Sequence, residues 1–194
     1  MEEPARKRAT YDDLYNIPEN MTGEIIDGDL IVSPRPSAEH VFATSLLGSE
    51  LVFSYYHGRG GPGGWIILVE SEIKLDEDTF VPDLAGWKKE HFSKPEGHNW
   101  ISVAPDWVCE ILSPSSIRND RIMKMGTYAK HRIPYFWLVD PINKTLEVFN
   151  LESGKWTFAG GFAEYAKVRV EPFQEIEIDL ANLWLEGQPK HLEQ

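Results

Sequence analysis

Residues 106–140 have the sequence DWVCEILSPSSIRNDRIMKMGTYAKHRIPYFWLVD. This stretch decides the fold, because it places two apolar strands on either side of a helix. The segment 106–113 is apolar on both faces apart from Glu110, a pattern typical of a strand in the middle of a sheet. A helix is predicted over about 117–131, and a second buried strand over 135–140. The region therefore predicts an α/β core.

Further strands and helices are predicted on the N-terminal side of this core. Residues 65–75 alternate apolar with polar side chains, which predicts one strand with a single buried face. After an acidic turn, residues 80–87 (FVPDLAGW) predict the next strand. The other expected elements are a short helix over 8–17 with Thr10 as its N-cap, a hairpin about Asp27-Gly28, and a long helix over about 38–57 capped by Ser37.

The C-terminal part of the chain predicts antiparallel structure. Residues 144–151 and 155–162 have the pattern of two strands joined near Ser153-Gly154, and one more short strand and a closing turn follow. No internal repeat, linker or low-complexity block interrupts the chain. We therefore expect residues 1–194 to form one α/β domain with a mixed sheet, its core spanning about 10–185.

The composition restricts the class of protein. Hydrophobic residues make up 42% of the 194 residues, yet no apolar run reaches the roughly 18 residues that a transmembrane helix requires. The N-terminus is charged and has no apolar segment behind it, so we expect no secretory signal. The single cysteine, Cys109, cannot form an internal disulfide, which fits a reducing compartment. We expect a cytoplasmic protein without a membrane span.

The net charge of −12 argues against a protein that binds nucleic acid over a broad basic surface. The segment 118–132 differs from the rest, because five basic residues stand there against Asp120 alone, a local balance of +4. A basic face on an acidic body can contact phosphate. Arg118 and Arg121 are therefore candidate nucleic-acid-binding residues.

Two carboxylates are placed inside apolar strands. Asp83 is predicted to share a strand face with Ala85 and Trp87, and Glu110 a face with its apolar neighbours. Buried carboxylates are paired, hydrogen-bonded or bound to metal. On adjacent strands the two acids can hold one hard cation such as Mg²⁺ or Mn²⁺. The alternative is that each acid pairs with a nearby Lys or Arg, or lies in water at a strand end.

The helix after Glu110 carries Asp120, Lys124 and Tyr128 at four-residue steps, hence on one face. If the helix returns across the strand, it brings Lys124 over the two carboxylates. The alternative is an Asp120–Lys124 pair on the surface, with Tyr128 in packing.

The ordered set of these motifs resembles a known bacterial family. The set consists of Pro82-Asp83, Glu110 with Ser113-Pro114-Ser115, Asp120 with Lys124 and Tyr128, and the run Pro134–Pro141. It is similar to the "putative restriction endonuclease" family that is common in cyanobacteria and was long catalogued as a domain of unknown function, within the PD-(D/E)XK nuclease superfamily. The resemblance covers about residues 10–185. It implies a restriction-endonuclease-like mixed β-sheet flanked by helices, with an N-terminal hairpin and a C-terminal β-hairpin as additions.

The resemblance also implies the site and the reaction. Asp83 and Glu110 would bind Mg²⁺ or Mn²⁺ for hydrolysis of phosphodiester bonds in nucleic acid, with DNA as the expected substrate. The superfamily has a lysine two residues after the acid, where this chain has Leu112; in this family a lysine of the next helix replaces it, here Lys124. His40 stands where the family often has a histidine, and a catalytic role and a local hydrogen bond are both retained as interpretations.

Other functions remain open from the sequence. The sequence does not fix the oligomeric state, and a homodimer is one option, because restriction-type nucleases often pair to cut two strands. The missing ExK lysine favours a regulatory or nucleic-acid-binding module that keeps the fold without turnover. The charge of −12 favours a metal-binding interaction protein that meets no nucleic acid.

Overall fold

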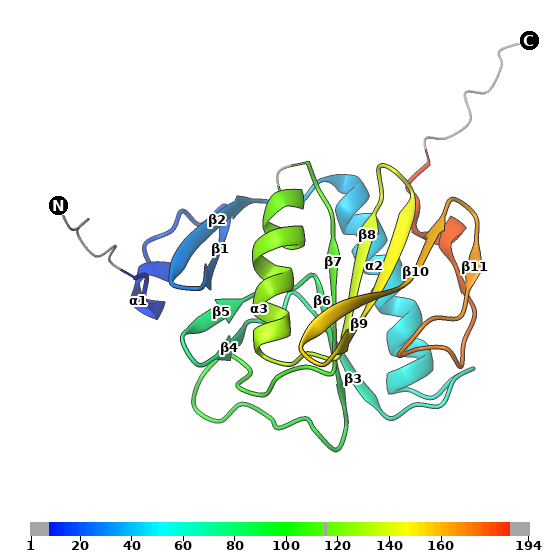
Figure 1. Ribbon diagram of the computed structural model, residues 1–194, viewed down its shortest axis with the longest axis horizontal. Helices are drawn as coiled ribbons and strands as arrows, with labels where there is room; N and C mark the ends of the chain where they lie inside the picture. The colour runs from blue at the N-terminus through cyan, green and yellow to red at the C-terminus, as the bar shows by residue number, and fades with distance from the viewer. Residues whose placement is uncertain (1–7, 115, 187–194) are drawn as a thin grey trace, which may run out of the picture.

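The computed structural model describes residues 8–114 and 116–186, and a six-stranded sheet in the order β10-β9-β8-β7-β6-β3 lies at its centre (Figure 1). The strands are β3 Trp65–Val69, β6 Leu84–Lys88, β7 Trp107–Ile111, β8 Tyr135–Asp140, β9 Thr145–Glu152 and β10 Lys155–Ala163. β7 and β8 run parallel, whereas the other neighbouring strands are antiparallel. The mixed α/β sheet predicted from the sequence is confirmed.

The parallel pair at the centre requires a crossover, which the predicted strand–helix–strand region supplies. The helix between β7 and β8 contains the π-helical segment η2, Asn119–Lys124, and continues as α3, Met125–Lys130. All five residues of β7 are buried, as expected for the central strand. The sequence prediction over 106–140 is thus confirmed in type and order.

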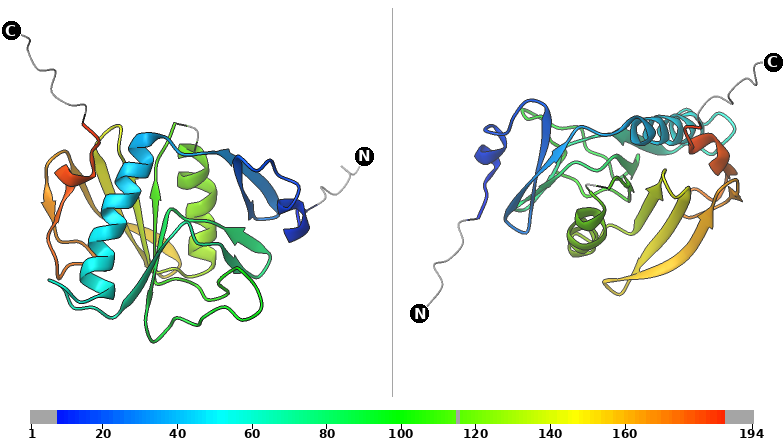
Figure 2. Two further views of the ribbon diagram at one scale, coloured as in Figure 1. Left: turned by 180° about the vertical axis from the view of Figure 1, so that it is seen from behind. Right: turned by 90° about the horizontal axis from the view of Figure 1, so that it is seen from above.

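Helices cover both faces of the sheet (Figure 2). On one face lies α2, Ala38–Leu51, extended by the π-helical segment η1, Val52–Tyr56; its buried residues pack with Trp107, Cys109 and Ile111 of β7. On the other face Tyr128 of α3 packs with Val108 and Leu112. Because side chains alternate along a strand, Glu110 points to the α3 face.

A second, smaller sheet in the order β2-β1-β5-β4 lies beside the first. Its strands are β1 Met21–Ile26, β2 Asp29–Pro34, β4 Ile73–Leu75 and β5 Asp78–Phe80, preceded by the short helix α1, Tyr11–Leu14, with Thr10 as its N-cap. The predicted hairpin is confirmed: Asp27 and Gly28 both have positive φ, 52° and 84°, as the tight turn between β1 and β2 requires.

The predicted strands 65–75 and 80–87 are wrong as continuous elements. The chain leaves the large sheet after Val69, turns at Glu70 with a φ of 45°, and enters the small sheet at Ile73. It returns between Phe80 and Leu84, where Pro82 has no N–H to donate to a sheet. Asp83 therefore lies in the connection between the sheets and not inside a strand.

The C-terminal segments complete the α2 side of the core. The predicted hairpin is present as β9 and β10, which extend the large sheet. Where one more strand was expected, two short strands pair with each other, β11 Lys167–Val168 and β12 Ile178–Asp179, before the 3₁₀ helix η3, Leu180–Leu183. Within residues 8–114 and 116–186, no helix has both the length and the apolar character of a transmembrane span.

Asp78 ties the small sheet to the end of α3. This carboxylate is fully buried; one oxygen accepts a hydrogen bond of 2.8 Å from the Asp27 N–H, and the other lies 2.7 Å from Lys130 Nζ and 2.8 Å from His131 Nε2. Burial alone would raise the pKa of Asp78, but the hydrogen bonds from Lys130 and His131 outweigh it and hold this pKa below its usual value.

Asp78→Asn should therefore destabilise the protein in a pH-dependent way. The folded-state pKa of Asp78 lies below the unfolded value of about 3.9, so its ionised carboxylate stabilises the fold above that pH, and the contribution is lost as pH falls through the folded value. At pH 7 the variant should lose about 1–3 kcal/mol of unfolding free energy. Urea denaturation across a pH series measures this loss. A deficit that stays constant down to pH 2 would contradict the ionic origin of the contact.

Candidate active site

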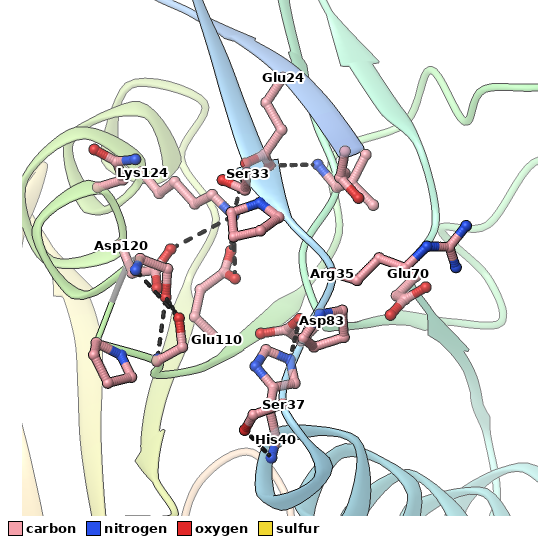
Figure 3. A pocket seen from close by; sticks show the side chains of 18 residues that line it. Glu24, Ser33, Arg35, Ser37, His40, Glu70, Asp83, Glu110, Asp120 and Lys124 are labelled. Atoms are coloured by element: carbon pink, nitrogen blue, oxygen red, sulfur yellow. Dashed lines mark hydrogen bonds and ion pairs between the residues drawn. The ribbon is translucent and has the colours of Figure 1, made fainter. Parts of the chain in front are cut away.

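A cavity of about 530 Å³ opens where the two sheets meet the helix η2. Its wall contains predicted site residues from four separate parts of the chain: His40, Asp83, Glu110, Asp120 and Lys124. Figure 3 shows their side chains turned toward one another within this pocket. The expectation that the helix brings Lys124 back over the carboxylates agrees with this arrangement.

Glu110 is the most deeply buried acid of the cavity wall, at 1% exposed. Both of its oxygens lie 3.2 Å from Lys124 Nζ, and Oε1 also accepts a hydrogen bond from the Tyr128 hydroxyl. Burial raises the pKa of Glu110; the Lys124 charge opposes this rise, and the charges of Asp120 and Asp83 add to it. The carboxylate is held in place by neighbours while its negative charge is poorly solvated.

Lys124 contacts three carboxylates at once. Its Nζ lies 3.0 Å from Glu24 and 3.6 Å from Asp120, besides the contacts with Glu110 (Figure 3). Burial alone would lower the pKa of Lys124, but the surrounding carboxylates, Glu110 first, outweigh it and raise this pKa well above its usual value. Lys124 is therefore a fixed ammonium and not a surface residue, which removes the alternative of an exposed Asp120–Lys124 pair.

Asp120 and Tyr128 lie on the same helical face as Lys124, as their spacing predicted. Asp120 is 2% exposed, and burial raises its pKa against the opposing charge of Lys124. Tyr128 is fully buried beneath Glu110, and burial together with the Glu110 charge raises its pKa. Both residues surround and orient the Glu110–Lys124 contact.

Asp83 is fixed by groups from two other elements. Its Oδ1 lies 2.8 Å from His40 Nε2 of α2, and its Oδ2 accepts a hydrogen bond of 2.6 Å from the N–H of Ile111. Ile111 directly follows Glu110 in β7. This hydrogen bond therefore holds the Asp83 carboxylate beside the backbone of the strand that carries Glu110. The Asp83 carboxylate is thus oriented in advance at the cavity wall.

His40 is placed by the first turn of α2. Ser37 caps this helix, accepting a hydrogen bond of 3.4 Å from the His40 N–H, and the imidazole itself is nearly buried. Its Nδ1 is buried with no hydrogen-bonding partner among the described residues. The ring therefore orients Asp83 through Nε2.

Glu24 is a site residue that the sequence did not reveal. It lies in β1 of the small sheet, 4% exposed, and reaches Lys124 across the cavity. The available signal was weak, because Glu24 stands before Ile25 and Ile26, which are both buried, so the strand shows no alternation that would mark the glutamate as buried.

The family follows from a comparison with known protein families. The model of the Uma2 family, described as "Putative restriction endonuclease", matches residues 8–181. This chain belongs to the Uma2 family. Among solved structures it is similar to a protein from Anabaena variabilis ATCC 29413, described as a putative nuclease belonging to DUF820, with a TM-score of 0.71. The two sequences are 25% identical, over 91% of this chain and 97% of the other. Among curated proteins, none matches the chain.

In the structure of this Uma2 protein, several positive charges of the basic segment 118–132 are paired with acidic side chains. Arg118 and Arg121 are both exposed, but neither lines the cavity, and Arg121 forms an ion pair with Glu147 of β9. Lys124 is buried and Lys130 is paired with Asp78. Three of the five cations of 118–132 are therefore held by acids of this chain, and the assignment of Arg118 and Arg121 to nucleic-acid binding stays a prediction.

The cavity carries an excess of acid that suits a cation. Its described wall contains five carboxylates, against two permanent cations; the acids are Glu24, Glu70, Asp83, Glu110 and Asp120, and the cations are Arg35 and Lys124. Among residues 8–114 and 116–186, no three His, Cys, Asp or Glu side chains are gathered as a preformed metal site. Mg²⁺ requires only one or two carboxylates and keeps water or substrate oxygens for its other positions. The donor set of this Uma2 cavity therefore fits a hard divalent cation.

Proposed function

We propose that this protein is a Mg²⁺-dependent endonuclease that hydrolyses phosphodiester bonds of DNA. The observation that carries the proposal is that Asp83, Glu110 and Lys124, although far apart in the sequence, line one cavity. Two carboxylates and an ammonium at one concave site are the groups that metal-assisted phosphodiester hydrolysis uses. Membership of the Uma2 family supports nuclease activity.

In this proposal Asp83 and Glu110 would hold the cation through their carboxylate oxygens. When bound, the ion supplies Lewis-acid polarisation of the scissile phosphate and a water molecule of lowered pKa. His40 and the Ile111 amide orient Asp83, and Tyr128 orients Glu110, so the acids need little rearrangement when the ion enters. Both Asp83 oxygens and Glu110 Oε2 each retain a lone pair beside their contacts, whereas Glu110 Oε1 already accepts from both Lys124 and Tyr128.

Lys124 provides the positive charge that the strand lacks at Leu112. Its ammonium reaches the Glu110 oxygens from the helix side of the sheet. There it orients the attacking water or stabilises the extra negative charge of the pentavalent transition state. The products are cut phosphodiester ends.

A cleavage assay tests the proposal. Supercoiled plasmid, branched DNA, single-stranded DNA and RNA are incubated with the protein in Mg²⁺, in Mn²⁺ and in EDTA. We expect cleavage of a DNA substrate that requires the divalent ion and is lost in Asp83→Asn. Cleavage that persists in EDTA, or an equally active Asp83→Asn protein, would refute the assignment.

A second candidate is a module that binds nucleic acid without cutting it. One observation favours it: the Lys124 ammonium, which the proposed reaction uses, is already paired with three carboxylates of this chain, Glu24, Glu110 and Asp120. This function predicts binding in EDTA that weakens with salt, and no cut products in Mg²⁺. The same assay, read by gel shift as well as by cleavage, separates the two.

A further inference from the structure

Glu24 connects two parts of the proposed active site. Its Oε1 accepts a hydrogen bond of 2.8 Å from the N–H of Val81, and its Oε2 lies 3.0 Å from Lys124 Nζ. Val81 stands two residues before Asp83 in the connection between the sheets. One buried carboxylate of the small sheet therefore contacts both the ammonium and the backbone that carries a proposed metal ligand.

The negative charge of Glu24 is not needed to neutralise Lys124. Glu110 and Asp120 already surround the ammonium at 3.2 Å and 3.6 Å. A third carboxylate buried beside a single ammonium adds a desolvation cost and repulsion among the acids. A neutral glutamine would still accept the Val81 hydrogen bond, so the charge serves something other than the backbone contact.

We propose that Glu24 is a positioning residue of the nuclease, which holds the Lys124 ammonium at a fixed place relative to Asp83. The attraction between Lys124 and Glu24 of the small sheet opposes the attraction of the ammonium to Glu110 of β7 and Asp120 of η2. Without it, the ammonium moves toward these two acids and away from the reacting phosphate. This inference rests on the proposed function, and it gives the small sheet a part in the reaction.

The charge pairing can be tested without any cleavage, by thermal unfolding in EDTA. Glu24→Gln removes the 3.0 Å ion pair with Lys124 together with the repulsion from the other acids, so the Tm of the protein that contains Lys124 should change little or fall. In a Lys124→Ala background, the same Glu24→Gln change should raise the Tm, because it then removes one of several unpaired buried charges. Equal Tm shifts in the two backgrounds would overturn the pairing of Glu24 with Lys124.

The positioning role is tested by the turnover number. Glu24→Gln should lower kcat by about 10- to 100-fold, the cost of a small misplacement of a reacting group, with KM nearly unchanged. In the Lys124→Ala background it should lower kcat no further. Multiplicative losses in the double variant would overturn the proposal, because they would show that Glu24 acts independently of Lys124.

Asp78→Asn is the matched control. Asp78 also lies in the small sheet, accepts a backbone hydrogen bond and pairs with a lysine of the same helix, but it lies outside the cavity wall. The folded Asp78→Asn protein should keep the wild-type kcat, although its Tm is lowered. An equal loss of kcat in Asp78→Asn would show that the Glu24 effect comes only from weaker packing of the small sheet against the helix. That result would overturn the proposal.

Two further outcomes are distinguishable. If Glu24→Gln abolishes the Mn²⁺-dependent rise in Tm of the wild-type protein, Glu24 is a metal ligand, and the positioning role is overturned. If the wild-type protein cuts no nucleic acid, the proposed function and the positioning role fall together, while the Tm cycle still decides the Glu24–Lys124 pairing.

Discussion

Lys124→Ala is expected to lower the turnover number of Mg²⁺-dependent cleavage by about 10²-fold or more, the scale of one positioned catalytic group. The ammonium lies 3.2 Å from both Glu110 oxygens, beside a proposed metal ligand, and in the proposed reaction it would stabilise negative charge on a phosphate bound there. Initial rates at saturating substrate, normalised to the folded fraction from circular dichroism, measure the effect. Normalisation is needed because the variant leaves three buried carboxylates without their cation and loses stability.

Lys130→Ala controls for that loss of stability. Lys130 lies on the same helix and also joins it to an acid of the small sheet, 2.7 Å from Asp78, but it does not line the cavity. Its activity per folded molecule should match the wild type. Full activity in Lys124→Ala would assign the catalytic role to another residue, and a comparable loss in Lys130→Ala would assign the effect to helix docking.

Divalent metal should raise the melting temperature of the wild-type protein. An ion that binds only the folded state stabilises it by RT ln(1 + [L]/Kd), about 2.7 kcal/mol at a hundredfold excess over Kd. For a domain of this size this corresponds to roughly 5–10 °C. A bound cation would reduce the repulsion among the carboxylates of the cavity wall. It would also favour the ionised form of Glu110, whose pKa is raised by burial. Thermal melts with and without millimolar Mn²⁺ measure the shift, and EDTA should reverse it.

The variants separate the metal site from the rest of the cavity. Asp83→Asn and Glu110→Gln should each lose the Mn²⁺-dependent shift, whereas Asp78→Asn should keep it. Lys124→Ala should also keep the shift, because removal of the ammonium leaves the carboxylates in place. No shift in the wild type, or an unchanged shift in Asp83→Asn, would favour two ordinary charge-paired acids.

Local patterns predicted most elements of the fold. The apolar run around Glu110, the Asp27-Gly28 turn and the Ser37 cap each depend on neighbours in the sequence, and each element lies where expected. The break at Glu70 was missed because alternation within 65–75 continues across it, although the two halves belong to different sheets. No local pattern within residues 65–75 indicates which of the two sheets each half will join.

Part of the candidate site was also predictable from local sequence patterns. Asp120, Lys124 and Tyr128 share a helical face, so their convergence on Glu110 follows from the helix period once the crossover is known. Glu24 could not be predicted in this way, because its contact with Lys124 joins segments one hundred positions apart through the pairing of β1 with β5. Likewise, only the fold reveals that Arg121 is paired with Glu147.

The three acids around Lys124 come from three separate parts of the fold: Glu24 from β1, Glu110 from β7 and Asp120 from η2. Opening any one of these elements takes one acid away from Lys124 and brings water to the buried charges that remain, so local fraying at this junction is costly. The hairpin β1–β2 and the helix should therefore exchange their amide hydrogens through a common opening, with similar protection. We therefore expect the pocket to form and to be lost as one cooperative unit.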